Sequence, residues 1–261
     1  MKKPRHLGHF SLLRRLLLAG VNGSFAGMLA CSLGCGQEPP KKTPALAPYE
    51  PLADGAWWNY EHLDWTEHVT VAATTVAGED AFVMTDSPNP KDNIRSDATL
   101  VERGGRVLRI AKEEYVIGAD GVATLKDSVS YGAGFTRFDE NWAGQAVGFA
   151  ETPEYERIET PAGGAPKPAE GRRHTFELLS LSTQVVTPLG SFDCIQIRRT
   201  KDWQAEEEGL DASDAQPKIF WFARGVGKVR ELNLDSGKGE LLSDYFIPDG
   251  AAAPPAPSTP Y

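Results

Sequence analysis

Short apolar runs separated by turn residues recur along the chain at the spacing of β-hairpins, and no window of about a dozen residues carries a sustained helical apolar stripe. Four turns separate such runs, at Gly104-Gly105, Asp120-Gly121, Pro188–Ser191 and Asp235–Gly239. An Asp-Gly pair suits the positive φ angles of a tight hairpin. The pattern predicts a mainly β fold, a single antiparallel domain with few short helices.

Strands near the C-terminus are apolar on both faces. Both alternating sets of side chains are apolar in Lys218–Ala223 and in residues 241–247, whereas Arg106–Ala111 has the pattern of a half-exposed strand. A strand that is apolar on both faces needs cover on both sides, which a strongly curved sheet or a partly closed barrel provides. The concave side of such a sheet could hold an apolar ligand. We favour the alternative that the protein's own side chains fill it, because small barrels usually pack their interiors.

Residues 1–30 have the layout of an export signal. They carry five basic and no acidic side chains, and an apolar stretch of 15 residues runs from Leu16 to Ala30. This is shorter than the roughly 20 residues of a membrane-spanning helix. Cys31 and Cys35 follow in sequences that both resemble the bacterial lipobox, whose cysteine thiol receives a diacylglycerol. We predict a lipoprotein with palmitate-bearing Cys31, which directly follows the apolar run, and Cys35 is the alternative.

Two other interpretations of this terminus stay open. One is an ordinary signal peptide with incidental cysteines, and the other is twin-arginine export, suggested by Arg14-Arg15. Neither cysteine is followed by Asp. By resemblance to the sorting rule of enteric bacteria, this favours an outer-membrane lipoprotein that faces the periplasm or the exterior. The N-terminal acyl chains would then hold the protein on the membrane.

Proline-rich segments flank the region of apolar runs. They lie at residues 36–51 and 248–261, and such composition does not build a packed core. We therefore predict a signal peptide at 1–30, a Pro-rich tether at 31–51, an antiparallel β domain at 52–247 and a disordered tail at 248–261. Inside the domain, residues 160–171 are expected to form a long surface loop.

The charge balance argues against a nucleic-acid partner. The formal net charge of the chain is −9. Because the first 30 residues are basic, the rest of the chain is more acidic than this value. Nucleic-acid binding depends on clustered Lys and Arg side chains that neutralise phosphates. We expect no nucleic-acid partner.

Three sequence strings each carry three residues that form a motif: Gly55, Trp58 and Tyr60; Gly190, Phe192 and Cys194; Trp221, Gly225 and Gly227. Together the three strings resemble the TapB-like family of bacterial envelope lipoproteins of unknown function, which is distantly like the lipoprotein-carrier folds. The resemblance implies a curved antiparallel sheet, no cofactor and no established catalytic residue. The acidic segment 206–214 departs from the family pattern.

No residue pattern marks a catalytic or metal centre. No G-x-S-x-G elbow, Walker loop, dinucleotide fingerprint or H-E-x-x-H pair occurs. Cys194 is expected to be a free buried thiol. The three histidines of the predicted domain, His62, His68 and His174, lack a usual ligand spacing and are expected to be solvated or hydrogen-bonded, so we predict no metal and no cofactor.

Two classes of function remain. The favoured one is a lipid-anchored cell-envelope protein that is not an enzyme and that binds an apolar ligand or an envelope protein. The alternative is a hydrolase on a β scaffold, which would need carboxylates such as Glu151, Glu154, Glu156 and Glu159 to converge. The tryptophans Trp57, Trp58 and Trp65 and Tyr60 could stack on a sugar or lipid but are favoured as core.

Overall fold

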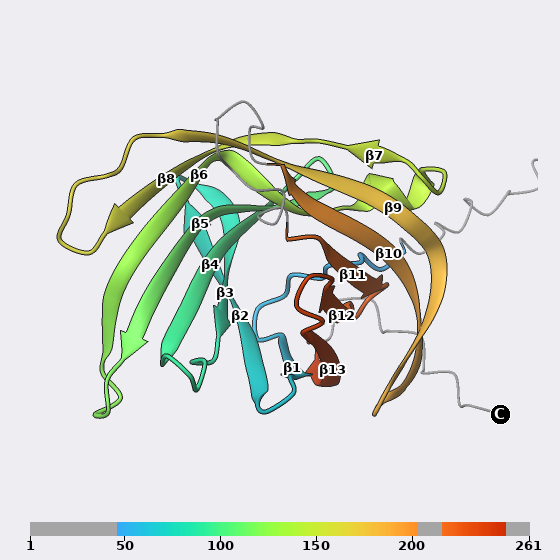
Figure 1. Ribbon diagram of the computed structural model, residues 1–261, viewed down its shortest axis with the longest axis horizontal. Helices are drawn as coiled ribbons and strands as arrows, with labels where there is room; N and C mark the ends of the chain where they lie inside the picture. Colours follow the sequence, from blue (N-terminus) through green and yellow to red (C-terminus); the bar gives the residue numbers. More distant parts are fainter. Residues whose placement is uncertain (1–45, 203–215, 249–261) are drawn as a thin grey trace, which may run out of the picture. The chain divides into compact units, whose positions relative to one another are not determined.

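The computed structural model describes residues 46–202 and 216–248 (Figure 1). The chain divides into two compact units, residues 1–43 and 44–261, and every described residue belongs to the second. The described part holds thirteen strands and one 3-10 helix. These are β1 (Trp57–Glu61), β2 (Thr66–Val76), β3 (Glu79–Asp86), β4 (Ile94–Arg103), β5 (Arg106–Ile117), β6 (Ala123–Asp139), η1 (Glu140–Gly144), β7 (Ala150–Glu151), β8 (Glu154–Pro161), β9 (Glu170–Thr187), β10 (Gly190–Asp202), β11 (Lys218–Ala223), β12 (Gly227–Asn233) and β13 (Gly239–Phe246).

Twelve of these strands close into an antiparallel barrel. Their order is β10-β11-β12-β13-β1-β2-β3-β4-β5-β6-β8-β9, and β9 pairs with β10 to complete the ring. The short β7 pairs with β9 outside this ring. The mainly β antiparallel prediction is confirmed, with full closure in place of a partly closed sheet.

Tight turns occur where the sequence predicts them. The four predicted turns join β4 to β5, β5 to β6, β9 to β10 and β12 to β13. Gly104, Gly105 and Gly121 take φ angles of 60°, 80° and 78°. A residue with a Cβ adopts such angles at a cost, so glycine at these positions favours hairpin connections.

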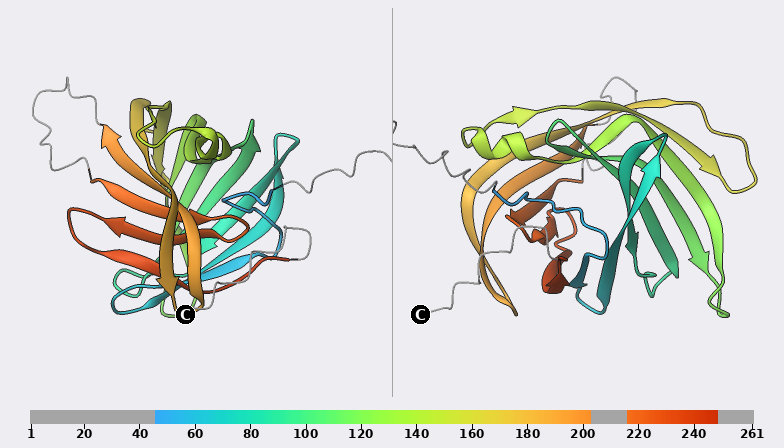
Figure 2. Two further views of the ribbon diagram at one scale, coloured as in Figure 1. Left: turned by 90° about the vertical axis from the view of Figure 1, so that its right-hand side faces the viewer. Right: turned by 180° about the vertical axis from the view of Figure 1, so that it is seen from behind.

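Both faces of β11 are covered, as its pattern requires. Phe220 and Phe222 line the barrel interior, while Trp221 packs in a separate cluster with Phe192 and Cys194 of β10. Figure 2 (left) shows β9 and β10 crossing in front of β11, β12 and β13. The ring of Phe192 meets Tyr245 of β13 edge-on, with centroids 6.4 Å apart. The tip of the β9–β10 hairpin therefore covers the outer face.

Residues just before β1 pack against the barrel. Tyr49, Glu50 and Pro51 are buried, although their proline-rich composition assigns them to the tether. The Gly225 backbone N–H donates to the Pro48 carbonyl at 2.7 Å, and the Tyr49 N–H donates to Glu140 Oε1 at 2.5 Å. This segment therefore connects η1 with the turn between β11 and β12.

Several predictions lie outside the described residues. These are the signal peptide, both candidate lipid sites Cys31 and Cys35, the acidic segment 206–214 and nearly all of the C-terminal tail. Among the residues that are described, no helix has the length and apolar character needed to cross a bilayer.

Candidate functional site

The barrel encloses a cavity of about 690 Å³. The expectation of a filled interior is therefore wrong. The reason is barrel size, because barrel diameter grows with strand number and side chains fill the interior at about eight strands. With twelve strands, the side chains leave space between them.

Charged side chains dominate the cavity wall. Among the described residues, nine basic and six acidic side chains line it. The basic ones are Arg109, Arg137, Arg157, Arg172, Arg173, Arg199, Lys201, Lys218 and Lys228; the acidic ones are Glu50, Glu67, Asp86, Glu159, Glu231 and Glu240. The concave side is therefore not the apolar surface that the strand pattern suggests. In Arg106–Ala111, the alternation of polar and apolar residues assigns Arg109 to the solvent-exposed face, but this side chain lines the cavity.

Most of the cavity charges neutralise one another. Arg137 Nε donates to Glu50 Oε1 at 2.8 Å, although the two residues are 87 positions apart. Lys218 Nζ contacts Glu231 Oε1 at 2.5 Å, and Lys228 pairs with both Glu231 and Glu240.

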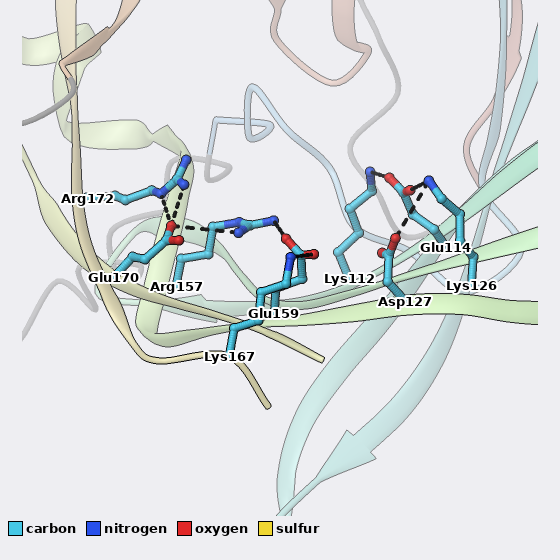
Figure 3. A network of polar contacts seen from close by, with 9 residues as sticks. All are labelled: Lys112, Glu114, Lys126, Asp127, Arg157, Glu159, Lys167, Glu170 and Arg172. Carbon is cyan, nitrogen blue, oxygen red and sulfur yellow. Dashed lines mark hydrogen bonds and ion pairs between the residues drawn. The ribbon is translucent and has the colours of Figure 1, made fainter. Parts of the chain in front are cut away.

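Figure 3 shows two further groups of ion pairs, one between β8 and β9 and one between β5 and β6. Arg157 lies between Glu159 and Glu170, at 2.8 and 3.8 Å. A second group in the same view places Lys126 beside both Glu114 and Asp127. These charges are satisfied within the protein and do not call for a ligand.

Arg199 of β10 differs from these groups. Within residues 46–202 and 216–248, no carboxylate lies at ion-pair distance from its guanidinium, which contacts the rings of Phe220 at 4.7 Å and Phe135 at 5.5 Å. Burial lowers its pKa to about 10; the more distant charge of Glu231 opposes this shift, and the charges of Arg109 and Arg137 add to it. A guanidinium placed between aromatic faces and other cations gains from an anion beside it.

Arg109 of β5 also lies beside the Phe135 ring. Its guanidinium carbon is 5.7 Å from the centroid of the Phe135 ring. Burial, followed by the charge of Arg137, lowers its pKa. Its buried Nε has no hydrogen-bond partner among the described residues. Arg109 and Arg199 thus provide two cations around one phenylalanine.

His174 of β9 adds a neutral polar group to the same wall. Its ring stacks on Tyr155 with centroids 5.4 Å apart and meets Phe135 edge-on at 5.0 Å. Burial, assisted by the charges of Arg199, Lys201 and Arg172, lowers its pKa to about 3. The buried Nδ1 has no hydrogen-bond partner among the described residues.

The other two histidines differ from each other. His68 Nδ1 lies 2.7 Å from Asn59 Oδ1, in agreement with the expectation of a hydrogen-bonded ring. His62 stacks face to face on Trp65 with centroids 4.4 Å apart. Its Nε2 approaches the carboxylates of Glu67 and Glu240, which come from two other strands and which no sequence spacing connects to it.

The motif residues of the first and third strings meet in space. Trp58 Nε1 donates to the Val226 carbonyl at 2.6 Å, and the Tyr60 hydroxyl donates to the Lys228 carbonyl at 3.0 Å. Gly227 lies beside the Trp58 indole. These contacts join β1 to the start of β12 across 168 positions.

The remaining motif residues shape turns and core. Gly55, Gly190 and Gly225 take positive φ angles of 80°, 122° and 69°. Cys194 is a free, buried thiol in the cluster that contains Trp221.

The aromatic residues near β1 have different positions. Trp58 and Tyr60 are buried. Trp57 and Trp65 are half-buried, and Trp57 stacks on Phe246 with ring centroids 6.4 Å apart. None of the four is a freely exposed platform for a sugar.

The carboxylates considered for hydrolysis do not converge. Glu151 accepts from Trp142 Nε1 at 2.8 Å and from Arg106 Nη2 at 3.0 Å. Glu154 and Glu156 are exposed on β8, while Glu159 lines the cavity. The acidic groups that do approach one another, Glu67 and Glu240, were not identified from the sequence.

Among solved structures, the chain is similar to a "putative lipoprotein" from Parabacteroides distasonis and to a "putative exported protein with YmcC-like fold" from Bacteroides fragilis. The first is 13% identical, with a TM-score of 0.44 over 77% of this chain and 99% of that chain. The second is also 13% identical, with a TM-score of 0.40 over 77% and 100%. No protein-family model and no curated protein matches the chain. These distant similarities assign no family, and membership of the TapB-like family stays a prediction.

Proposed function

We propose that the chain is a lipid-anchored cell-envelope protein whose barrel binds a small molecule with an anionic group and an apolar body. The anchor is proposed at Cys31, with Cys35 as the alternative, on the basis of the basic and apolar layout of residues 1–30. The proposed location is the outer membrane, facing the periplasm or the exterior, because neither cysteine is followed by Asp.

The environment of Arg199 is the observation from which we infer the class of ligand. This guanidinium faces a cavity of about 690 Å³ without a carboxylate partner among the described residues. A planar guanidinium binds carboxylate and phosphate groups through two parallel hydrogen bonds. Arg109 lies on the same aromatic group, so a second cation is available to the same anion.

The aromatic rings around Arg199 account for the apolar body. Phe135, Tyr155 and Phe220 line the cavity, and rings of this kind bury apolar ligand surface. An anionic head and an apolar body together describe a fatty-acid-like or aromatic acid. This modifies the apolar ligand expected from the strand pattern, because the cavity wall supplies cations.

Competition for bound 1-anilinonaphthalene-8-sulfonate tests the charge requirement. We expect dodecanoate and dodecyl phosphate to displace this fluorescent anion from the wild-type protein. Dodecanol should compete at least about tenfold less well, since it lacks the charge that strengthens a hydrogen bond to arginine. Dodecylammonium should not compete. Equal competition by dodecanol and dodecanoate would overturn the anionic ligand class.

A pair of neighbouring arginines gives the matched variants. Arg199→Gln should weaken dodecanoate binding by about 10- to 100-fold, the effect of losing a charge-assisted hydrogen bond. Arg198→Gln removes an exposed arginine that pairs with Glu177 on the outside of the barrel, and it should leave binding unchanged. Equal losses in both variants would show that the effect is not local to the cavity.

The anchor has its own test. Cells labelled with radioactive palmitate should yield labelled wild-type protein, and Cys31→Ser should abolish the label. If Cys35→Ser removes the label instead, the alternative site is correct. Normal processing of the precursor in the presence of globomycin would overturn the lipoprotein assignment.

A hydrolase is the second candidate, because Glu67, Asp86 and Glu240 line one cavity. Convergent carboxylates in an accessible cavity are the arrangement that acid and base catalysis requires. Chromogenic esters, phosphoesters and glycosides offered to the purified protein test this function. Turnover lost in Glu67→Gln and retained in the exposed variant Glu154→Gln would support it, and absence of turnover on all three substrate classes would exclude these reactions.

A further inference from the structure

We propose that His62, Glu67 and Glu240 form a binding site for a divalent transition-metal ion such as Zn²⁺. One ligand atom from each residue lies within 4.8 Å of the other two. His62 Nε2 is 3.6 Å from Glu67 Oε2 and 3.5 Å from Glu240 Oε2. Zinc binds such atoms at about 2.0–2.2 Å in a tetrahedron, which sets neighbouring ligand atoms about 3.3–3.6 Å apart.

Neighbouring strands of the barrel bring the three residues together. Glu67 on β2 pairs with Tyr60 on β1. On the other side of β1, antiparallel β13 places Leu241 opposite Glu61. The next pair along the two chains is His62, which follows β1, and Glu240. One nitrogen and two carboxylate oxygens from neighbouring backbone segments make up a donor set suited to zinc and similar ions.

The imidazole is held in place before any ion binds. The His62 N–H donates to the Trp65 carbonyl at 2.9 Å, which closes the connection between β1 and β2. The imidazole stacks on the Trp65 ring with an angle of 8° between the planes. A ligand with a fixed orientation loses little entropy on metal binding.

One buried nitrogen at the site lacks the partner that buried polar groups normally have. His62 Nε2 is buried and has no hydrogen-bond partner among the described residues, which leaves it directed at two carboxylates. The Glu240 side chain is 10% exposed. Its Oε1 contacts Lys228, and its Oε2 faces His62. Buried polar atoms in native proteins are nearly always satisfied, and a cation coordinated by His62 Nε2 and the two carboxylates would satisfy this nitrogen.

Electrostatics favours a cation at the same place. The carboxylates of Glu67 and Glu240 approach one another and His62, and Asp86 lines the same cavity as both glutamates. Lys228 neutralises part of the acidic charge by pairing with Glu231 and Glu240. Glu67, by contrast, has no ion pair to a lysine or arginine among the described residues.

Cobalt substitution tests the site directly. The chelator-treated protein should bind one equivalent of Co²⁺ and develop the visible absorption bands of a tetrahedral complex. Isothermal titration with Zn²⁺ should give the same stoichiometry, with Mg²⁺ much weaker because it prefers oxygen ligands in octahedral geometry. No cobalt spectrum and no zinc heat would overturn the proposal.

Matched variants locate the ion. His62→Ala and the nearly isosteric Glu67→Gln should each weaken Zn²⁺ binding by at least about tenfold, since each removes a ligand. His68→Ala removes a nearby histidine that faces Asn59, and it should bind Zn²⁺ like the wild type. Loss of binding in His68→Ala with retention in His62→Ala would overturn the assignment. Circular dichroism of each variant confirms that the barrel is retained.

Discussion

The carboxylate of Glu50 accepts a hydrogen bond from Arg137 inside the barrel, with 2.8 Å between Oε1 and Nε. Their side chains are 6% and 19% exposed. The pair links the segment before the first strand to β6, the strand that carries Phe135 of the cavity wall. The chain before β1 is therefore part of the barrel's polar interior.

Removal of Glu50 should be costly. Glu50→Ala leaves the Arg137 guanidinium buried without its partner, and we expect a loss of about 3–5 kcal/mol in the free energy of unfolding. Urea denaturation followed by tryptophan fluorescence measures it. Glu154→Ala, at an exposed position of β8, is the control and should change stability by less than about 0.5 kcal/mol. Similar values for both variants would contradict a structural role for the pair.

Gly227 should tolerate alanine poorly. It has a φ of +101°, and a Cβ there would lie 3.3 Å from Trp58 Nε1, whose hydrogen bond to Val226 holds β1 against β12. Gly227→Ala should lower the melting temperature more than Gly121→Ala. Gly121 has a φ of +78°, but nothing lies within 4 Å of its Cβ position. Backbone strain costs about 1–3 kcal/mol at either site, so equal shifts would mean that crowding at Trp58 contributes nothing.

His174 should make the barrel less stable in mild acid. Its folded-state pKa of about 3 lies below the 6.5 of an exposed histidine, since burial and the charges of Arg199, Lys201 and Arg172 disfavour protonation. The unfolded chain therefore binds a proton that the folded chain excludes, and stability falls as the pH drops from 6.5 toward 3. Between pH 7.5 and pH 5, this effect should lower the free energy of unfolding by about 2 kcal/mol.

The variant His174→Gln isolates that effect. The difference in unfolding free energy between wild type and variant should change by that amount between pH 7.5 and pH 5, whereas carboxylate titrations common to both proteins cancel. Denaturant titrations at the two pH values give the four free energies. A difference that is independent of pH would show that His174 titrates normally.

Cys194 should not react in the folded protein. Its thiol is 1% exposed, and burial together with the charge of Asp193 raises its pKa to about 12. With Cys31 and Cys35 replaced by serine, Cys194 is the sole cysteine. Its labelling by iodoacetamide at pH 8 should be at least about a hundredfold slower than after unfolding in urea, because the thiolate is the nucleophile. Equal rates would place the thiol at the surface.

Local sequence determines much of the barrel. Gly121 and the other turn residues favour φ angles that reverse the chain, and the two-sided apolar character of Lys218–Ala223 requires cover on both faces. Both features act between neighbouring residues or along one strand. Turns, strand type and antiparallel connectivity are therefore predictable from the sequence.

The cavity depends on relations that no single strand contains. The alternation around Arg109 and Arg199 marks two faces but does not say which one is inside, because the direction of curvature comes from all twelve strands together. The same holds for His62, Glu67 and Glu240, which β1, β2 and β13 bring together from opposite ends of the domain. The sequence by itself determined a barrel-forming set of antiparallel strands, since turns and alternation are local. Only tertiary closure decided that charged faces point inward, because that choice depends on packing among strands far apart in the chain.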